Sequence, residues 1–252
     1  MDAELARRAI ALVDLTDLTH DCTPAAIDEL CGRARRYGTA AVCVWPDFVA
    51  QSAELLAGSP VVVATVVNFP SGDERPYAVG VITDRVLTDG ATEVDVVLPF
   101  RWFAAGDVER CRRVLGEVRT RTTGTALMKV ILETGELPDL TTVDQAARFA
   151  IEQGADFVKT STGKTPVSAT IDAATTILRV IADADRPVGI KPSGGISSAD
   201  EAAAYIAAAE EIMGDGWVTP ATFRFGASGL LNALIDAAGL DPAPAGRSAD
   251  GY

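Results

Sequence analysis

The feature that most constrains the fold is the regular alternation of short apolar runs with amphipathic, alanine-rich stretches along the 252 residues. The apolar runs read as strands, and each is separated from the next by about the length of one strand and one helix. They lie at residues 10–14, 40–45, 61–68, 92–98, 125–132, 156–161, 188–192 and 223–227. Eight such units predict a closed (β/α)8 TIM barrel with a single domain. The alternative, an open doubly wound sheet, usually has fewer strands at this length.

Helical patterns fill the intervals between these runs. Examples lie at residues 24–38, 108–120, 143–154 and 198–214. Ser198 and Glu201 have the spacing of a capping box, and Gly214 is placed to stop the helix that follows them.

The C-terminal segment differs from the rest of the chain. After Gly239 the helical periodicity disappears, and the sequence becomes rich in Pro, Ala and Gly. We therefore expect a (β/α)8 barrel domain over residues 1–239 and a flexible tail over residues 240–252 that ends in Tyr252.

The charge balance limits the partners of the chain. With 35 acidic and 22 basic residues, its formal net charge is -13, which opposes binding to nucleic acid and to anionic membranes. An anionic substrate must therefore be held by local groups. The sequence contains no pattern of a signal peptide or a membrane span, so we expect a cytoplasmic protein.

Cysteine and histidine are too sparse for several common kinds of site. The four cysteines form no CxxC pair, and His20 is the only histidine. Zinc sites of the usual kind and serine triads are therefore disfavoured. We expect reduced, buried thiols, although Cys43 at the end of a strand could react with enals derived from aldehydes. His20 lies in a turn-like segment, which favours a structural or surface role.

Lysine is rare and unusually placed. Only four of the 22 basic residues are lysines, and three of these, Lys129, Lys159 and Lys191, follow apolar strand residues. Arginine stays protonated, whereas a buried lysine readily loses its proton and can then act as a nucleophile. This distribution indicates amine chemistry.

Strand ends provide the partners for that chemistry. In a barrel, the carboxyl ends of the strands converge on the mouth where active sites lie. The polar residues near these ends are Asp14, Asn68, Asp95, Lys129, Lys159 and Lys191. Two ammonium groups on adjacent strands would repel by roughly 4 kcal/mol and would lower the pKa of one lysine toward about 7. One amine would then attack a carbonyl and form a Schiff base. Asp95 is expected either to move protons or to form a salt bridge with a lysine.

A phosphate site is predicted at the last three strands. The segment "STGKT" resembles a nucleotide-binding loop, but Val158 stands where that motif requires glycine. Glycines nevertheless follow each of these strands, where barrels often bind phosphate through backbone N–H groups. The residues concerned are Gly163, Lys164, Gly194, Gly195, Gly226, Ala227 and Ser228.

Motifs along nearly the whole chain resemble those of the 2-deoxyribose-5-phosphate aldolase family. They are "DLTDLTHDCT", "AAVCVWPDF", "ATVVNFPSG", "TEVDVVLPF", "LMKVILETGEL", "GADFVKTSTGK", "GIKPSGGI" and "RFGASGLL". The resemblance implies a class I aldolase on a (β/α)8 barrel with no metal or organic cofactor. It implies reversible cleavage of 2-deoxyribose 5-phosphate, a small phosphosugar, to glyceraldehyde 3-phosphate and acetaldehyde. A homo-oligomer, either a dimer or a tetramer, is also expected.

The same resemblance implies roles for individual residues. Lys159 would form the Schiff base, Lys191 would lower its pKa, and Asp95 would shuttle protons. Asp14 and Lys129 would support that relay. The segments that contact phosphate would contribute Gly163, Lys164, Gly194, Gly195, Gly226 and Ser228. Tyr252 would assist proton transfer at the enamine carbon.

Two departures and three alternatives stay open. Several relatives have a second hydroxyl where Gly229 stands, and some carry Asn where Thr19 stands. These differences bear on phosphate affinity and on the network of the first strand. A transaldolase-like or keto-acid aldolase would use the same amine on another carbonyl, and a catalytically silent barrel would bind phosphosugars for regulation. A metal-dependent aldolase is disfavoured by the single histidine.

Overall fold

Eight parallel strands form the centre of the molecule. The computed structural model describes residues 1–241, so most of the predicted tail, including Tyr252, lies outside the described residues. The strands are β1 (Val13–Asp17), β2 (Ala41–Val44), β3 (Val62–Val67), β4 (Glu93–Val97), β5 (Leu127–Ile131), β6 (Phe157–Lys159), β7 (Gly189–Lys191) and β8 (Phe225–Ala227). Their order in the sheet is β7-β6-β5-β4-β3-β2-β1-β8.

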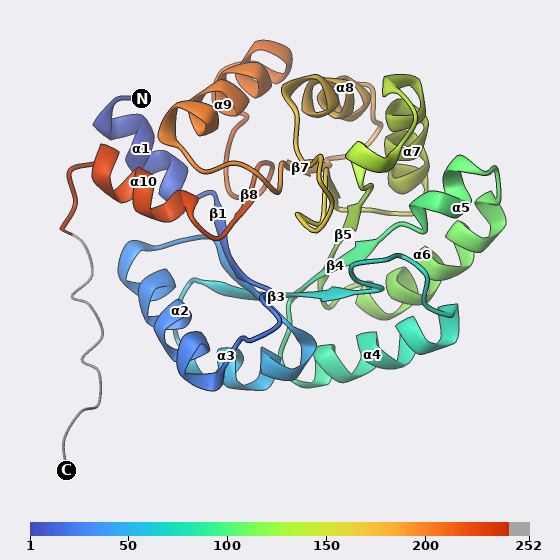
Figure 1. Cartoon of the computed structure of the whole chain (residues 1–252), viewed down its shortest axis with the longest axis horizontal. Helices are drawn as coiled ribbons and strands as arrows, with labels where there is room; N and C mark the ends of the chain where they lie inside the picture. The colour runs from blue at the N-terminus through green and yellow to red at the C-terminus, as the bar shows by residue number, and fades with distance from the viewer. Residues whose placement is uncertain (242–252) are drawn as a thin grey trace.

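The sheet closes on itself between its two end strands. Ile190 pairs with Phe223 and Ser193 pairs with Gly226, both in parallel, so β7 lies next to β8. Helices surround the strands as an outer ring (Figure 1). The predicted single-domain (β/α)8 barrel is confirmed.

Helices alternate with the strands as expected for this fold. They are α1 (Ala3–Ile10), α2 (Pro24–Tyr37), α3 (Val49–Leu55), α4 (Pro76–Thr88), α5 (Phe100–Ala104), α6 (Val108–Thr122), α7 (Leu140–Glu152), α8 (Ile171–Ala182), α9 (Ala199–Met213) and α10 (Leu230–Ala237), with short 3-10 turns at Pro46–Phe48 and Thr134–Glu136. Local sequence explains their ends. The Thr23 side chain accepts a hydrogen bond from Ala26 N at the start of α2, and Gly38 adopts a left-handed conformation at its end. The predicted capping box of Ser198 and Glu201 is present at α9.

The first strand differs from its prediction. The apolar run assigned to residues 10–14 is divided between the end of α1 and the start of β1, which extends to Asp17. Asp2 caps α1, whose buried face includes Ala9 and Ile10. A short apolar run fits the end of a buried helix as well as a strand, so the pattern alone could not place this boundary. As a result, Asp14 lies inside β1 rather than at its carboxyl end.

Small side chains leave room inside one half of the barrel. Ala41 and Cys43 on β2, with Ala64 and Val66 on β3, form a compact buried cluster that is separate from the main core. The main core lies between the strands and the helices. Charged side chains from the other strands extend into the space that this cluster leaves. None of the helices in residues 1–241 has the length and apolar character needed to cross a membrane.

Candidate active site

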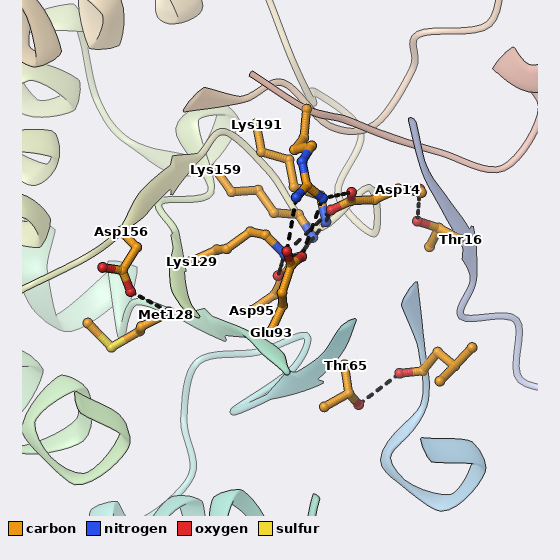
Figure 2. A network of polar contacts seen from close by, with 12 residues as sticks. Asp14, Thr16, Thr65, Glu93, Asp95, Met128, Lys129, Asp156, Lys159 and Lys191 are labelled. Carbon is orange, nitrogen blue, oxygen red and sulfur yellow. Dashed lines mark hydrogen bonds and ion pairs between the residues drawn. The ribbon is translucent and has the colours of Figure 1, made fainter. Parts of the chain in front are cut away.

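Seven charged side chains are buried together in the barrel. They are Asp14, Glu93, Asp95, Lys129, Lys159, Lys191 and Arg224. They come from β1, β4, β5, β6 and β7, and from the residue that precedes β8. The labelled side chains of this group converge on one region (Figure 2). Buried charges are costly unless they are paired, and each of these has at least one partner of opposite charge.

Asp95 is the centre of this network. Its Oδ2 atom accepts hydrogen bonds from Lys159 Nζ and Lys191 Nζ, each over 2.8 Å. Its Oδ1 atom accepts one from Lys129 Nζ over 3.0 Å. Burial is the largest single influence on this carboxyl and would raise its pKa, but the three lysines together outweigh burial and hold the pKa of Asp95 well below its usual range. The salt bridge foreseen as an alternative for Asp95 is therefore present, with three lysines.

A second layer of ion pairs supports the first. Arg224 Nη1 lies 2.7 Å from Asp14 Oδ1, and Arg224 Nη2 lies 3.0 Å from Glu93 Oε1. Lys129 Nζ lies 2.5 Å from Glu93 Oε2. Lys191 Nζ lies 2.6 Å from Asp14 Oδ2, an ion pair whose angles do not make a hydrogen bond. This layer fixes the positions of the amines around Asp95.

Glu93 and Arg224 were not predicted from the sequence. Both had a signal in the strand alternation. Glu93 lies two residues before Asp95 in the same strand, so the two side chains point to the same face. Arg224 lies between Phe223 and Phe225, on the opposite face from both. A charged residue that alternates with buried aromatic residues points into the barrel.

The charge count of the network favours one neutral amine. Three carboxylates face three lysines and one arginine, so the group carries one excess positive charge if every lysine is protonated. An uncompensated buried charge is strongly unfavourable. The loss of one proton from a lysine gives an electrically balanced network.

Lys159 is the lysine whose environment favours that loss. Burial is the largest influence and lowers its pKa, Asp95 offsets only part of this effect, and the charge of Lys191 lowers the pKa further. Burial also disfavours the charged forms of Lys129 and Lys191, but their carboxylate partners outweigh it and raise both pKa values. Lys159 is 3% exposed, whereas the other two are completely buried. Only Lys159 combines a lowered pKa with contact to solvent.

This arrangement corrects the predicted cause of the pKa shift. The sequence analysis expected repulsion between Lys159 and Lys191 to be the main cause. The two residues are indeed register partners on β6 and β7. However, Asp95 lies between their amines, and burial exceeds the effect of Lys191 on the pKa of Lys159.

A cavity of about 760 Å³ opens at the carboxyl ends of β6, β7, β8 and β1. All seven residues predicted for the phosphate site line it, namely Gly163, Lys164, Gly194, Gly195, Gly226, Ala227 and Ser228. Gly163, Gly194 and Gly195 have positive φ angles of 74°, 85° and 81°, which side chains other than glycine rarely adopt. No atom lies within 4 Å of the position that a Cβ would take on Gly195, whereas Ser168 fills that position on Gly194. Such turns present backbone N–H groups to an anion.

Glu133 fixes the first of these turns and was not foreseen. Its carboxylate accepts hydrogen bonds from Thr162 N over 3.2 Å, from Thr162 Oγ1, and from Thr165 Oγ1 over 3.3 Å. Its φ of 57° is unusual for a residue other than glycine. Burial raises its pKa. The only sequence signal was its position directly after an apolar run, in "VILETGEL".

The remaining candidates have other places. Asn68 holds a turn, because its side chain donates to Val97 O and accepts from Glu74 N, each over 2.8 Å. His20 is exposed and stacks on Trp45 at 6.4 Å between ring centroids, as expected for a surface role. Cys43 is buried near the lysines, and burial raises the pKa of its thiol. Tyr252 is outside the described residues.

Residues 1–241 contain no group of three or more His, Cys, Asp or Glu side chains arranged to hold a metal ion.

Comparison with known proteins places this site in a family. Residues 8–234 match the DeoC/LacD family of aldolases. A deoxyribose-phosphate aldolase of Agrobacterium fabrum (strain C58 / ATCC 33970) is 46% identical over 253 residues, which cover 99% of this chain and 96% of the relative. The resemblance drawn from the motifs is thereby confirmed.

Solved structures agree with the sequence match. A deoxyribose phosphate aldolase from Aeropyrum pernix, described as a unique tetramer, has a TM-score of 0.77 and 25% identity, covering 91% of this chain and 90% of its own. A protein of Toxoplasma gondii ME49, provisionally named as the same kind of aldolase, has a TM-score of 0.86 and 26% identity, with 94% and 95% coverage. Similarity in sequence and in structure thus extends over most of the chain, which belongs to the DeoC/LacD family of aldolases.

Proposed function

We propose that this aldolase reversibly cleaves 2-deoxy-D-ribose 5-phosphate to D-glyceraldehyde 3-phosphate and acetaldehyde through a Schiff base on Lys159. One observation carries the choice of amine. Among the three buried lysines, Lys159 alone has a lowered pKa and alone keeps some contact with solvent, at 3% exposure. The name of the Agrobacterium fabrum relative supports the substrate.

In the first half of the reaction, the neutral Lys159 amine attacks carbon 1 of the open-chain sugar. The resulting carbinolamine takes up a proton on its hydroxyl and loses water, which leaves a protonated imine. Asp95 accepts a hydrogen bond from Lys159 Nζ over 2.8 Å, so it is placed to take and return the protons of these steps. Asp14 and Lys129 hold Asp95 and Lys191 in position.

In the second half, the protonated imine accepts the electron pair of the bond between carbons 2 and 3. The hydroxyl on carbon 3 gives up its proton, the carbon becomes an aldehyde, and D-glyceraldehyde 3-phosphate leaves. The enamine takes a proton at carbon 2, and water hydrolyses the imine to acetaldehyde and the free amine. By the resemblance, Tyr252 assists the protonation at carbon 2.

The phosphate group would bind at the glycine turns of the cavity. A phosphate dianion needs donors and positive charge, and the chain as a whole carries a net charge of -13. The turns that contain Gly163, Gly194 and Gly226 would offer backbone N–H groups, while Lys164 and Ser228 would offer side-chain donors.

Reductive trapping tests this proposal. Borohydride added with 2-deoxyribose 5-phosphate should leave a reduced two-carbon or five-carbon adduct on the peptide that contains Lys159. Lys159→Ala should lose both the adduct and aldolase activity, while Arg36→Gln on the exposed face of α2 should keep both. An adduct on another lysine, or full activity of Lys159→Ala, would overturn the assignment.

A substrate panel separates the alternatives. Faster cleavage of a keto-acid aldol or a ketose phosphate than of 2-deoxyribose 5-phosphate would replace the proposed substrate. Tight binding of phosphosugars without turnover would favour a silent regulatory barrel. Loss of activity in excess chelator would favour a metal-dependent reaction.

The proposal extends to assembly and location. We expect a cytoplasmic homo-oligomer, a dimer or a tetramer, as the sequence analysis did. The Aeropyrum pernix relative, described as a tetramer, supports an assembly of this kind. Light scattering of the purified protein gives its mass in solution directly, and a monomer would contradict this expectation.

A further inference from the structure

The cavity extends beyond the glycine turns to helix α2. Two cationic side chains, Lys164 and Arg33, are among the residues that line it. Lys164 Nζ donates a hydrogen bond to Leu18 O over 2.8 Å, so its ammonium is turned toward the loop after β1. Two carboxylates, Asp17 and Glu29, line the same cavity. An anion that enters the cavity therefore meets both cationic and anionic side chains. Whether the cavity attracts it depends on the position of Arg33.

Arg33 is held in place without losing its charge. Its Nη2 atom donates a hydrogen bond to Asn232 Oδ1, which links α2 to α10 across the cavity wall. An amide oxygen is neutral, so this partner orients the guanidinium but leaves its positive charge unbalanced. Within residues 1–241, no carboxylate lies within 4.0 Å of Arg33, even though Glu29 precedes it by one turn of α2. A guanidinium has five N–H donors, and the contact with Asn232 leaves others available.

The turn at Gly229, which starts α10, leaves the cavity open. Gly229 lines the cavity, and no atom lies within 4 Å of the position that a Cβ would occupy there. Asn232 N donates to Gly229 O over 3.2 Å, so the residue that orients Arg33 is tied to this turn. The wall beside Ser228 thus offers no side-chain donor from Gly229, whereas Arg33 offers a charged one.

We propose that Arg33, oriented by Asn232, is a specificity-determining residue that binds, from α2, the phosphate group of the substrate held at the glycine turns of this cavity. The inference rests on the proposed function and adds a residue to it. Arginine binds phosphate through two parallel N–H donors, an arrangement that neither lysine nor glutamine reproduces. Because the phosphate is remote from the bond that breaks, Arg33 strengthens substrate binding and leaves the chemical step unchanged.

Two substrates distinguish this role from a structural one. The rates with 2-deoxyribose 5-phosphate and with 2-deoxyribose would be measured for the wild type and for Arg33→Gln. We expect Arg33→Gln to raise KM for the phosphorylated sugar roughly tenfold, with kcat retained and kcat/KM for 2-deoxyribose unchanged. The matched control is Arg36→Gln, three residues along α2, where the guanidinium lies over the Tyr37 ring and outside the cavity. An equal fall for both sugars, or no change for either, would overturn the proposal.

A binding measurement keeps the test independent of turnover. Glycerol 3-phosphate would be titrated by calorimetry into the wild type, Arg33→Gln, Arg36→Gln and Asn232→Asp. Its Kd should rise roughly tenfold in Arg33→Gln and should stay unchanged in Arg36→Gln. Asn232→Asp should also weaken binding, because an aspartate would neutralise the guanidinium and repel the phosphate. Unchanged affinity in Arg33→Gln would refute the role of Arg33.

The two experiments also separate this inference from the proposed function. If the wild type cleaves neither sugar while glycerol 3-phosphate binding depends on Arg33, the proposed function fails and the anion site stands. If the wild type cleaves the phosphorylated sugar and neither KM nor Kd depends on Arg33, the function stands and the inference fails.

Discussion

Lys159 and Lys191 donate hydrogen bonds to the same carboxylate oxygen, Asp95 Oδ2, each over 2.8 Å. Besides burial, this shared acceptor influences the pKa of each amine. Lys191 has a further partner in Asp14 at 2.6 Å, so its pKa is raised and it stays charged. Lys159 has Asp95 alone, and part of the attraction from Asp95 is balanced by the charge of Lys191. Besides burial, which is the largest influence, Lys191 therefore lowers the pKa of Lys159 partly by repulsion and partly by sharing its counterion.

Replacement of Lys191 by leucine should shift the pH dependence of the reaction to higher pH. Lys191→Leu removes the repulsion and leaves Asp95 to stabilise the protonated form of Lys159. Both effects raise the pKa of Lys159, so the neutral nucleophile appears only at higher pH. The acidic limb of the kcat/KM profile should move up by roughly one unit or more. The profile of Arg36→Gln serves as the control, and an unmoved limb in a folded Lys191→Leu protein would contradict the shared-acceptor account.

Arg224 should contribute strongly to stability through its two carboxylates. Arg224→Met leaves Asp14 and Glu93 short of one counterion in the buried network, so the free energy of unfolding should fall by roughly 3–5 kcal/mol. The double variant Arg224→Met/Glu93→Gln removes one of the stranded charges. Its free energy of unfolding, measured by urea denaturation, should fall by less than the sum of the decreases in Arg224→Met and in Glu93→Gln. Additive losses would show that Arg224 and Glu93 are not coupled.

The fold was largely predictable because its signal repeats along the chain. Each apolar run is short, buried on both faces and followed by an amphipathic helix. One such run alone could be a strand or part of a buried helix, but eight repeats of the same unit indicate strands. The first strand was misplaced because its run also completes the buried face of α1, through Ala9 and Ile10. Nothing in the local pattern separates the last turn of a buried helix from the first residues of a strand.

The site was only partly predictable, for a different reason. Rarity and placement identified Lys129, Lys159 and Lys191, but the choice among them depends on how many carboxylates each amine meets across the barrel. Those contacts join residues far apart in the chain, such as Asp95 and Lys191, which are 96 positions apart, and Asp14 and Lys191, which are farther apart still. Arg33 was overlooked because arginine is the common surface cation of this chain, and only the structure places one beside the cavity.

The buried carboxylates should make the protein lose stability in acid. Asp14 and Asp95 have lowered pKa values in the folded state because the nearby cations outweigh the opposing effect of burial. In the unfolded chain both should titrate near pH 4, so the unfolded state takes up protons first as the pH falls. The contribution of these two carboxylates to the free energy of unfolding is complete above about pH 4 and is lost progressively as the pH falls below it. Urea midpoints should stay level from about pH 7 to 5 and should fall toward pH 3, whereas a level midpoint down to pH 3 would contradict the predicted linkage.

Glu133 should affect the phosphorylated substrate selectively. Glu133→Ala leaves the hydrogen-bond donors of Thr162 and Thr165 without their acceptor, which loosens the turn before Gly163. KM for 2-deoxyribose 5-phosphate should rise roughly tenfold, with a smaller change in kcat/KM for 2-deoxyribose. Thr165→Ala removes a single hydroxyl from the same carboxylate and should have a smaller effect. An equal loss for both sugars would indicate that Glu133 supports Lys159 rather than the turn.

Gly226 should be essential for activity because the position that a Cβ would occupy on it faces both Ser193 and Lys191. A Cβ on Gly226 would lie 2.4 Å from Ser193 Oγ and 3.0 Å from Lys191 Cε, in a position where the barrel closes. Gly226→Ala must displace one or both side chains, and a displacement of about 1 Å near the reacting groups can lower kcat/KM by about 100-fold. The overpacked site should also lose roughly 1–3 kcal/mol of unfolding free energy. Gly116→Ala on α6 is the matched control, since its added Cβ meets no atom within 4 Å, and it should keep full activity. If Gly226→Ala were as active as Gly116→Ala, the reaction would have to tolerate displacement of Ser193 or of Lys191, whose amine donates a hydrogen bond to Asp95.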